Sequence, residues 1–237
     1  CFEMLNDFNG LDYLLVPVGG GGLIAGCSVV AKSMKSDIKI IGVESELYPS
    51  LSNEFYNRKD FCQGSTIAEG IAVHEIGKIP LQIIRNNVDD VLRVSETSIE
   101  RSISMFALSE KVVVEGAGAV GLAAILENQQ LFENKKVGIM LCGGNIDSKL
   151  LSSILMRDLV RAGQITTLTI TMPDKPGQLS KISKICADSG ANVLQVEHRR
   201  FTMDLSASLT KLNITIETHN QEHLKEIVKT ISENDLP

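Results

Sequence analysis

The sequence predicts an α/β domain, built on a parallel twisted sheet with helices on both faces, followed by a ferredoxin-like α+β domain. Three observations predict this arrangement. Short apolar runs alternate with helical patterns through residues 11–163. Glycine clusters follow several of these runs, at the strand ends where parallel sheets bind ligands. The order then changes to strand–helix–strand–strand–helix, so we expect domains at residues 1–163 and 164–237.

Four strands and three helices are expected in the first domain. Apolar runs predict the strands, at residues 12–18, 39–43, 91–94 and 137–141. Apolar residues at helical spacing predict the helices, at residues 22–35, 97–111 and 120–128. Because strands and helices alternate, the strands should be parallel and covered by helices on both sides.

Three strands and two helices are expected in the second domain. They are predicted at residues 166–172, 192–201 and 209–217 for the strands, and at residues 177–189 and 221–232 for the helices. This is a ferredoxin-like unit without its last strand, which should begin at Pro237. The sequence also starts with Cys1 rather than Met, so we expect it to be truncated at both ends.

Charge and cysteine usage argue against several classes of protein. The net charge is −6 with a pI near 5.3, and no run of Lys and Arg exceeds two residues, so no nucleic-acid partner is expected. The five cysteines form no C-x-x-C pair, which argues against a disulfide framework and a zinc site and favours the cytoplasm. The uncharged stretch 13–31 contains Pro17 and five glycines, so it predicts a strand, a loop and a helix rather than a membrane span.

The most informative stretch is the glycine run Gly19–Gly22 within residues 16–26. Here a predicted strand ends, four glycines follow and a helix begins. Glycines let several backbone N–H groups converge on one anion, and the helix adds free amides and the positive end of its dipole. We therefore predict a phosphate-binding loop rather than a turn that needs glycine only for its dihedral angles.

A dinucleotide is the alternative guest of such a loop. Residues 116–121 match the G-x-G-x-x-G spacing, and Glu44 ends a predicted strand about 20 residues after the glycine run, where a ribose-binding acid would lie. However, the run itself misses the spacing by one residue, and the strand after residues 116–121 ends in Cys142 rather than an acid. These half-matches leave an NAD-dependent dehydrogenase as an alternative.

A third glycine loop, residues 141–147, follows the last predicted strand of the first domain. Its Cys142 would face a ligand held by Gly19–Gly22. Taken alone, Cys142 is more simply interpreted as a buried thiol next to a glycine turn.

Together the three glycine motifs resemble the fold-type II pyridoxal-phosphate enzymes, and among them the threonine dehydratases and more distantly the serine racemases and serine dehydratases. The motifs are Val-Gly-Gly-Gly-Gly-Leu-Ile-Ala-Gly, Val-Glu-Gly-Ala-Gly-Ala and Cys-Gly-Gly-Asn, in the order and with the separations typical of the family. From about residue 165 the chain resembles an ACT domain, through residues 173–179 and 189–193. The resemblance implies pyridoxal 5′-phosphate as cofactor and conversion of L-threonine to 2-oxobutanoate and ammonia.

The resemblance also implies the cofactor-binding residues, which are Gly19, Gly20, Gly21, Gly22, Leu23, Cys142, Gly143 and Asn145. The glycines would bind the phosphate through their amides, and Asn145 would support the loop in which Cys142 meets the pyridine nitrogen. A thiol there leaves that nitrogen largely unprotonated, which suits β-elimination. Glu115 is the candidate catalytic residue close to the ring, and a helix-end carboxylate is its alternative interpretation. Some relatives hold a cation near the glycine loop, for which Glu44 or Glu69 could serve, but we assign no metal site.

The chain departs from the family at the residues that carry activity. The family attaches its cofactor to a Lys in a Ser-Phe-Lys-x-Arg-Gly motif upstream of the glycine loop, and this motif is absent; the nearest string, Ser33-Met-Lys35, follows the loop. The Ser-x-Gly-Asn loop that binds the substrate carboxylate is absent as well. We therefore expect the later half of a threonine dehydratase, inactive on its own. The alternative is a non-catalytic amino-acid sensor or assembly protein on the same scaffold.

The resemblance to ACT domains implies an amino-acid effector that binds between two such domains. The matching residues are Asp174, Gly177, Gln178, Leu179 and Asn192. Independently of the resemblance, the start of the helix expected at residues 177–189 offers free amides to a carboxylate. We expect isoleucine or valine as effector in isoleucine biosynthesis, with a nucleotide-activated catabolic enzyme as the alternative, and a homo-oligomer as the assembled protein.

Overall fold

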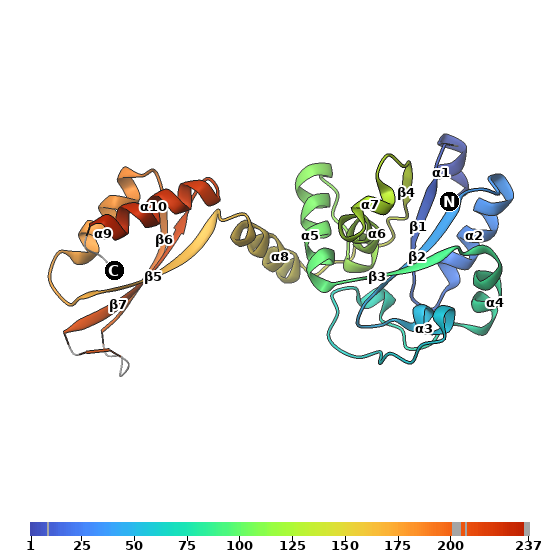
Figure 1. The fold of residues 1–237 in the computed structure, drawn as a ribbon, viewed down its shortest axis with the longest axis horizontal. Coiled ribbons are helices and arrows are strands. Elements are labelled where there is room, and N and C mark those ends of the chain that lie inside the picture. The colour runs from blue at the N-terminus through green and yellow to red at the C-terminus, as the bar shows by residue number, and fades with distance from the viewer. Residues whose placement is uncertain (9, 201–204, 207, 235–237) are drawn as a thin grey trace. The chain divides into compact units, whose positions relative to one another are not determined.

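The structure is a computed structural model that describes residues 1–237 except residues 9, 201–204, 207 and 235–237. The chain divides into two compact units, residues 1–154 and residues 155–237 (Figure 1). The first unit has apolar clusters on both faces of its sheet, and the second has a core of its own.

A four-stranded parallel sheet forms the centre of the first unit. Its strands are β1 (Tyr13–Pro17), β2 (Lys39–Ser45), β3 (Asp90–Val94) and β4 (Val137–Ile139), in the order β3-β2-β1-β4. Every neighbouring pair is parallel, so the carboxyl ends of the strands lie at one edge of the sheet. The predicted α/β fold class is confirmed.

Helices cover both faces of this sheet (Figure 1). They are α1 (Phe2–Asp7), α2 (Gly22–Met34), α3 (Ser50–Tyr56), α4 (Lys78–Asn87), α5 (Glu96–Met105), α6 (Gly116–Glu127) and α7 (Gln129–Phe132), with short 3-10 and π-helical turns at Glu69–Ile71 and Phe106–Glu110. α8 (Ser148–Arg161) begins in the first unit and ends in the second. In β1, Leu14 and Val16 pack with α2 and α4, whereas Leu15 points to the opposite face and packs with α5 and α6. Because both faces are buried, the strands are continuous apolar runs in the sequence.

The sequence prediction misses α1, α3, α4, α7 and α8, and two differences from it are informative. α6 begins at Gly116 rather than at residue 120, because its glycines serve close packing and not a loop. A Cβ atom at Gly118, for example, would stand 2.7 Å from the carbonyl oxygen of Cys142. α4 is absent from the prediction, and it has Pro80 in its first turn, where a missing N–H costs no helical hydrogen bond.

The second unit is a three-stranded antiparallel sheet with two helices on one face. Its elements are β5 (Ile165–Pro173), α9 (Gln178–Asp188), β6 (Asn192–Arg199), β7 (Leu209–Glu217) and α10 (Gln221–Glu233), and the strand order is β5-β7-β6. Ile182 of α9 and Ile227 of α10 pack with Leu212 of β7 in its core. This is the predicted ferredoxin-like arrangement. Phe201, the predicted end of a strand, and Pro237, the predicted start of the last one, lie outside the described residues.

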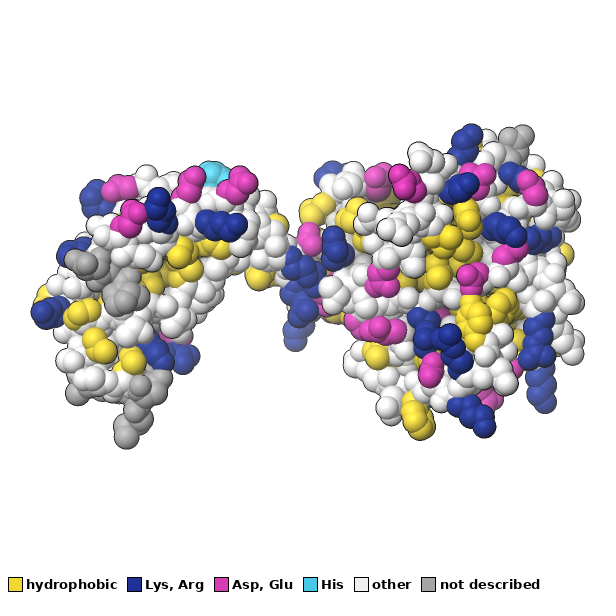
Figure 2. Space-filling model, in the orientation of Figure 1, with side chains coloured by type: hydrophobic (Ala, Val, Ile, Leu, Met, Phe, Trp, Pro, Cys, Tyr) yellow, Lys and Arg dark blue, Asp and Glu magenta, His cyan; other side chains and the backbone are white. Residues whose placement is uncertain are grey.

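Charged side chains of both signs and hydrophobic side chains lie on the face of each unit that Figure 2 shows. The acidic and basic side chains are interspersed there. In the part of the chain that the structure describes, no helix is both long enough and apolar enough to cross a membrane.

Candidate active site

Three backbone segments meet at the carboxyl edge of the parallel sheet. Residues 18–21 connect β1 to α2, residues 140–147 connect β4 to α8, and Glu115 immediately precedes α6. Together they line a cavity of about 280 Å³. Its lining consists of Pro17, Gly19, Gly20, Gly21, Gly22, Leu23, Gly70, Ile71, Glu115, Ala117, Cys142 and Gly143. The structure thus brings most of the predicted site residues to one cavity, and we call it the glycine-loop cavity.

The glycine run forms the start of α2. Gly21 is the residue before the helix, and its φ of +87° lies in the left-handed region that glycine adopts without strain. A Cβ atom at Gly20 or Gly22 would meet no atom within 4 Å, so the space beside the backbone is open to a ligand. The N–H groups in the first turn of a helix have no acceptor within the helix. The loop therefore offers free donors and the positive end of the helix dipole, which suits a phosphate.

α4 and the residue before it hold the glycine run in place. The N–H of Gly77 donates to the carbonyl oxygen of Gly20 at 3.1 Å. A Cβ atom at Gly21 would stand 3.0 Å from Cβ of Pro80 and 3.1 Å from Cδ1 of Ile84. Glycine is therefore required at position 21 by packing as well as by backbone conformation. No pattern in the sequence predicts this support, because the contact joins segments that are far apart in the chain.

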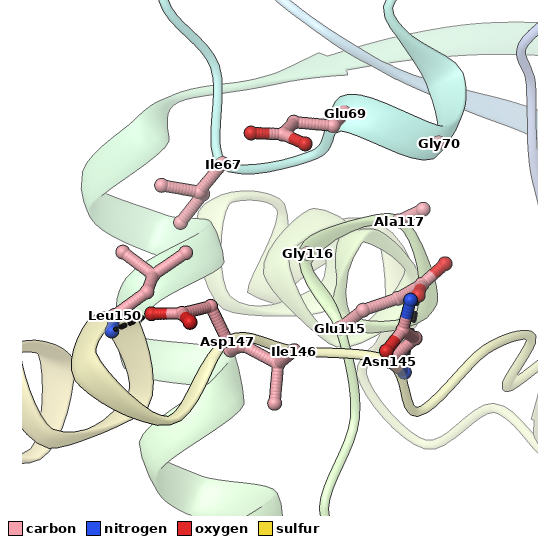
Figure 3. A pocket seen from close by; sticks show the side chains of 10 residues that line it. All are labelled: Ile67, Glu69, Gly70, Glu115, Gly116, Ala117, Asn145, Ile146, Asp147 and Leu150. Atoms are coloured by element: carbon pink, nitrogen blue, oxygen red, sulfur yellow. Dashed lines mark hydrogen bonds between the residues drawn. The ribbon is translucent and has the colours of Figure 1, made fainter.

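Glu115 lines both the glycine-loop cavity and a second cavity of about 310 Å³, which Figure 3 shows. The second cavity is lined by Ile67, Glu69, Gly70, Glu115, Gly116, Ala117, Asn145, Ile146, Asp147 and Leu150. The backbone N–H of Glu115 donates to the carbonyl oxygen of Gly143 at 3.3 Å, and its Oε2 accepts the N–H of Asn145 at 3.3 Å. These bonds fix a half-buried carboxylate where it borders both cavities. Of the predicted cofactor residues, Asn145 lines the second cavity rather than the first.

Three carboxylates line the second cavity, from Glu69, Glu115 and Asp147 (Figure 3). Asp147 accepts the N–H of Leu150 at 3.0 Å, so it is engaged at the start of α8. Among the residues that the structure describes, no group of three His, Cys, Asp or Glu side chains is placed to hold a metal ion.

Cys142 is half-buried and lies close to Glu115. Burial raises the pKa of its thiol above the ordinary cysteine value, and the negative charge of Glu115 raises it further. The thiol is therefore protonated at neutral pH, where it forms only weak hydrogen bonds.

Glu44 is engaged within the fold and does not face a ligand. Its side chain is fully buried at the end of β2, and its two oxygens accept the N–H groups of Leu51 and Ser52, each at 2.9 Å, at the start of α3. Burial raises the pKa of this carboxyl, and the hydrogen bonds from Ser52 and Leu51 oppose that rise. Residues 116–121 lie inside α6, and residues 111–115 before them form no strand. Both features that suggested a dinucleotide site therefore have structural roles instead.

The predicted effector residues lie at two ends of the sheet in the second unit. One group follows β5, and it consists of Asp174, Gly177, Gln178 and Leu179. The other is Asn192, the first residue of β6. Asn192 pairs with Glu217 of β7, and so does Ile165, the first residue of β5. Asn192 therefore lies at the end of the sheet where β5 begins. β5 has nine residues, and at about 3.4 Å per residue the two groups are roughly 27 Å apart along the sheet. A single copy of this unit does not bring them together.

Comparison with known protein families now identifies both units. Residues 1–143 match the family described as pyridoxal-phosphate dependent enzyme, and this match covers more than half of the chain. It includes the glycine run, Glu115 and Cys142. The chain belongs to the pyridoxal-phosphate-dependent enzyme family. Pyridoxal 5′-phosphate is the cofactor of this family, and the open glycine run with its free helix amides fits the cofactor phosphate. Residues 162–235 match the ACT domain, which the second unit therefore contains.

Pyridoxal-phosphate enzymes that act on threonine and serine are among the similar proteins. L-threonine ammonia-lyase of Thermotoga maritima is 37% identical over 231 residues, which are 97% of this chain and 57% of that protein. Catabolic L-threonine dehydratase TdcB of Escherichia coli K12 is 38% identical over 156 residues, 64% of this chain and 47% of that protein. The crystal structure of serine racemase from Dictyostelium discoideum superposes with a TM-score of 0.55 at 33% identity, covering 61% of this chain and 47% of that one. The chain thus spans about half of the length of these relatives.

Proposed function

We propose that this chain is part of a pyridoxal-phosphate-dependent threonine ammonia-lyase, which converts L-threonine to 2-oxobutanoate and ammonia under the control of an ACT domain. The observation that carries the proposal is the cavity in which the glycine run, Cys142 and Glu115 meet. The Thermotoga maritima protein supports threonine as substrate, because its likeness extends over 97% of the chain and so includes both units.

The glycine run is assigned to the cofactor phosphate. Its free N–H groups donate to the phosphate oxygens, and the positive end of α2 stabilises their charge. Leu23 and Ile71, which line the same cavity, supply apolar contacts for the pyridine ring. Gly143 and Cys142 close the cavity on the side of β4.

Cys142 is assigned to the pyridine nitrogen. Because burial and Glu115 keep its thiol protonated, Cys142 forms a weak hydrogen bond with that nitrogen and does not give it a full proton. When bound, the cofactor then supplies a moderate electron sink, which suits elimination of a β-hydroxyl group. Glu115 borders the ring and holds the Cys142 loop through the N–H of Asn145.

The lysine that attaches the cofactor is assigned to polypeptide outside these 237 residues. Among the described residues, no lysine lines either cavity. On α2 and directly after it, Lys32 is paired with Asp89 at 2.9 Å, and Lys35 donates to the carbonyl oxygen of Leu11 at 2.8 Å. We therefore expect the 237-residue chain to bind the cofactor without a covalent bond and to leave threonine unchanged.

The effector, isoleucine or valine, is assigned to a site between two copies of the ACT domain. β6 is at the edge of the sheet, where Leu194 and Val196 are 48% and 41% exposed. Antiparallel pairing of two such edges would bring Asn192 of one copy toward residues 174–179 of the other and bridge the separation of roughly 27 Å. The first turn of α9 would bind the effector carboxylate, and Leu179 would contact its aliphatic side chain.

The deciding experiment uses the protein made from its complete native gene. Borohydride reduction in the presence of pyridoxal phosphate, followed by peptide mapping, should label one lysine outside these 237 residues. Oxo-acid formation should give 2-oxobutanoate from L-threonine faster than pyruvate from L-serine. Gly21→Ala should abolish the label and the activity, whereas Gly26→Ala, in the middle of α2 with no atom within 4 Å of its Cβ, should retain both.

Two other outcomes would redirect the assignment. If the protein made from the complete gene retained no pyridoxal phosphate, the non-catalytic sensor or assembly protein would be favoured. Conversion of L-serine to D-serine without oxo-acid formation would favour a racemase, the activity named for the similar Dictyostelium discoideum structure.

A further inference from the structure

A short backbone segment separates the two cavities, and we call residues 66–71 the wall segment. Gly70 lines both cavities, whereas Ile71 lines only the glycine-loop cavity. Ile67 and Glu69 line only the second cavity (Figure 3). The segment includes the 3-10 turn Glu69–Ile71. A shift of this segment therefore changes the shape of both cavities at once.

The wall segment also touches the parts of the site assigned to the cofactor. A Cβ atom at Gly19 would stand 3.2 Å from Cα of Ile71, so the segment lies directly against the glycine run. A Cβ atom at Gly70 would stand 3.3 Å from Oε1 of Glu115. The segment is thus in close contact with the glycine run on one side and with the carboxylate of Glu115 on the other.

Glu96, the first residue of α5, holds the start of this segment. Its Oε1 accepts the hydroxyl of Thr66 at 2.6 Å and that of Ser45 at 3.0 Å, and its Oε2 accepts the N–H of Ile67 at 2.8 Å. Thr66 is 7% exposed, and its hydroxyl oxygen in turn accepts the N–H of Ala68 at 3.1 Å. Hydrogen bonds to a carboxylate are roughly twice as strong as neutral ones, so Glu96 is a firm anchor. Glu96 itself lines neither cavity.

We propose that Glu96 is a positioning residue, which sets the shape of the cofactor cavity through Thr66 and the wall segment. The inference rests on the proposed cofactor role of the glycine-loop cavity. Without the carboxylate, the N–H of Ile67 and the hydroxyl of Thr66 lose their common acceptor, and residues 66–71 are free to move relative to the glycine run. Binding of the pyridine ring suffers, whereas the glycine run keeps its own support from Gly77.

The test measures binding of two probes to the 237-residue chain by calorimetry. The first, 4′-deoxypyridoxine 5′-phosphate, has the ring and phosphate of the cofactor but no aldehyde, so it forms no Schiff base with lysines. The second is inorganic phosphate. We expect Glu96→Gln to lower the affinity for the first probe about tenfold, equivalent to about 1.4 kcal/mol. The affinity for phosphate should change less than about twofold.

Glu127→Gln is the matched control. Glu127 accepts the N–H and the hydroxyl of Ser95 at 3.0 and 2.6 Å, directly before Glu96, so it supports the same end of α5 without touching the wall segment. Its removal should lower thermal stability and leave the affinity for both probes unchanged. If Glu96 had only a structural role, Glu96→Gln would behave like Glu127→Gln, with lower thermal stability and unchanged affinity for both probes.

Thr66 provides a second pair of variants that keeps the test valid if Glu96→Gln fails to fold. Thr66→Val should lower the affinity for the ring-containing probe. Thr66→Ser, which keeps the hydroxyl group, should bind this probe as the unchanged chain does. The inference would be overturned if Glu96→Gln, or both Thr66 variants, bound the ring-containing probe as tightly as the unchanged chain does. That result would leave the cofactor assignment intact. Failure of the unchanged chain to bind either probe would overturn both.

Discussion

The backbone of Gly143 lies against the carboxylate of Glu115 with no space for a side chain between them. The carbonyl oxygen of Gly143 accepts the N–H of Glu115 at 3.3 Å, and the φ of +85° at Gly143 turns the chain toward it. This contact joins the start of α6 to the loop after β4. It also brings the charge of Glu115 close enough to raise the pKa of Cys142.

Gly143→Ala should destabilise the first unit by about 2–3 kcal/mol, because alanine is strained at this φ and its Cβ collides with Glu115. Thermal unfolding followed by circular dichroism measures the loss. In the double variant Gly143→Ala/Glu115→Ala the collision is removed and only the backbone strain of about 1–2 kcal/mol remains. The double variant should therefore be more stable than the sum of the single effects predicts. Strict additivity would show that the two residues are not in contact.

Gly21→Ala should weaken binding of inorganic phosphate by tenfold or more, ~1.4 kcal/mol. Its backbone conformation is unfavourable for alanine, and a Cβ atom there would be tightly packed against Pro80 and Ile84. Phosphate titration by calorimetry measures the change. Gly26→Ala is the control, and it should raise helix stability by about 0.5–1 kcal/mol with phosphate binding unchanged. Similar affinities for the two variants would argue against phosphate binding at this loop.

Alkylation of Cys142 should be slow at pH 8, and its rate should keep rising with pH beyond the ordinary cysteine pKa of about 8.5, because the thiolate is the reactive form. Glu115→Gln removes one of the causes of the raised pKa of Cys142, so the rate at pH 8 should increase severalfold. Iodoacetamide labelling with peptide mapping separates Cys142 from the other cysteines. An unchanged rate in Glu115→Gln would mean that Glu115 does not raise the pKa of Cys142.

The same raised pKa predicts a loss of stability in alkaline solution. The folded state holds the Cys142 proton more tightly than the unfolded state does, so the stabilisation is complete below the unfolded pKa. It disappears as the pH rises through the folded pKa. Cys142→Ser should remove this part of the alkaline decline in the free energy of unfolding, which urea titrations between pH 7 and pH 10 would measure.

Asp174→Ala and Asn192→Ala should each abolish binding of isoleucine or valine, and a mixture of the two variants should recover part of it. If the site lies between two copies, half of the mixed dimers are heterodimers with one intact site each, so about one quarter of the sites return. Calorimetry on the mixture after subunit exchange gives this fraction. No recovery would place all effector contacts within one copy.

Asp89→Asn should reduce the loss of stability in acid by on the order of 1 kcal/mol after solvent screening. Partial burial by itself raises the pKa of Asp89, but the Ile40 N–H and the ammonium groups of Lys32 and Lys39 outweigh it and hold the pKa below its usual value. The contribution is therefore present above the unfolded pKa and is lost as the pH falls through the folded one. Urea unfolding between pH 3 and pH 7 tests this, with the exposed Asp37→Asn as control. Identical acid profiles for the two variants would contradict it.

Several features of the fold and site follow from the sequence because they are local properties of the chain. Continuous apolar runs can be satisfied only in a sheet buried on both faces, and Gly19–Gly22 between a strand and a helix predicts a loop with open backbone donors. The relation of Asp174 to the start of a helix is equally local. These features need only neighbouring residues, so composition and spacing are sufficient to predict them.

Contacts between distant segments decide the rest. Residues 116–121 have the spacing of a nucleotide loop, yet they lie inside α6, where the carbonyl oxygen of Cys142 requires a glycine at position 118. Glu44 has the sequence position of a ribose-binding acid, yet it is buried against the start of α3. The link between Glu96 and Thr66 spans thirty residues and has no pattern in the sequence.

The sequence by itself determined the positions of the strands, the glycine run and the residues available for a site, since each of these depends on the dihedral preferences and polarity of adjacent residues. The tertiary structure alone decided which of those residues share a cavity. Parallel strands bring together residues that are far apart in the chain, such as Gly21 and Cys142. Only the packed sheet fixes the distance between them.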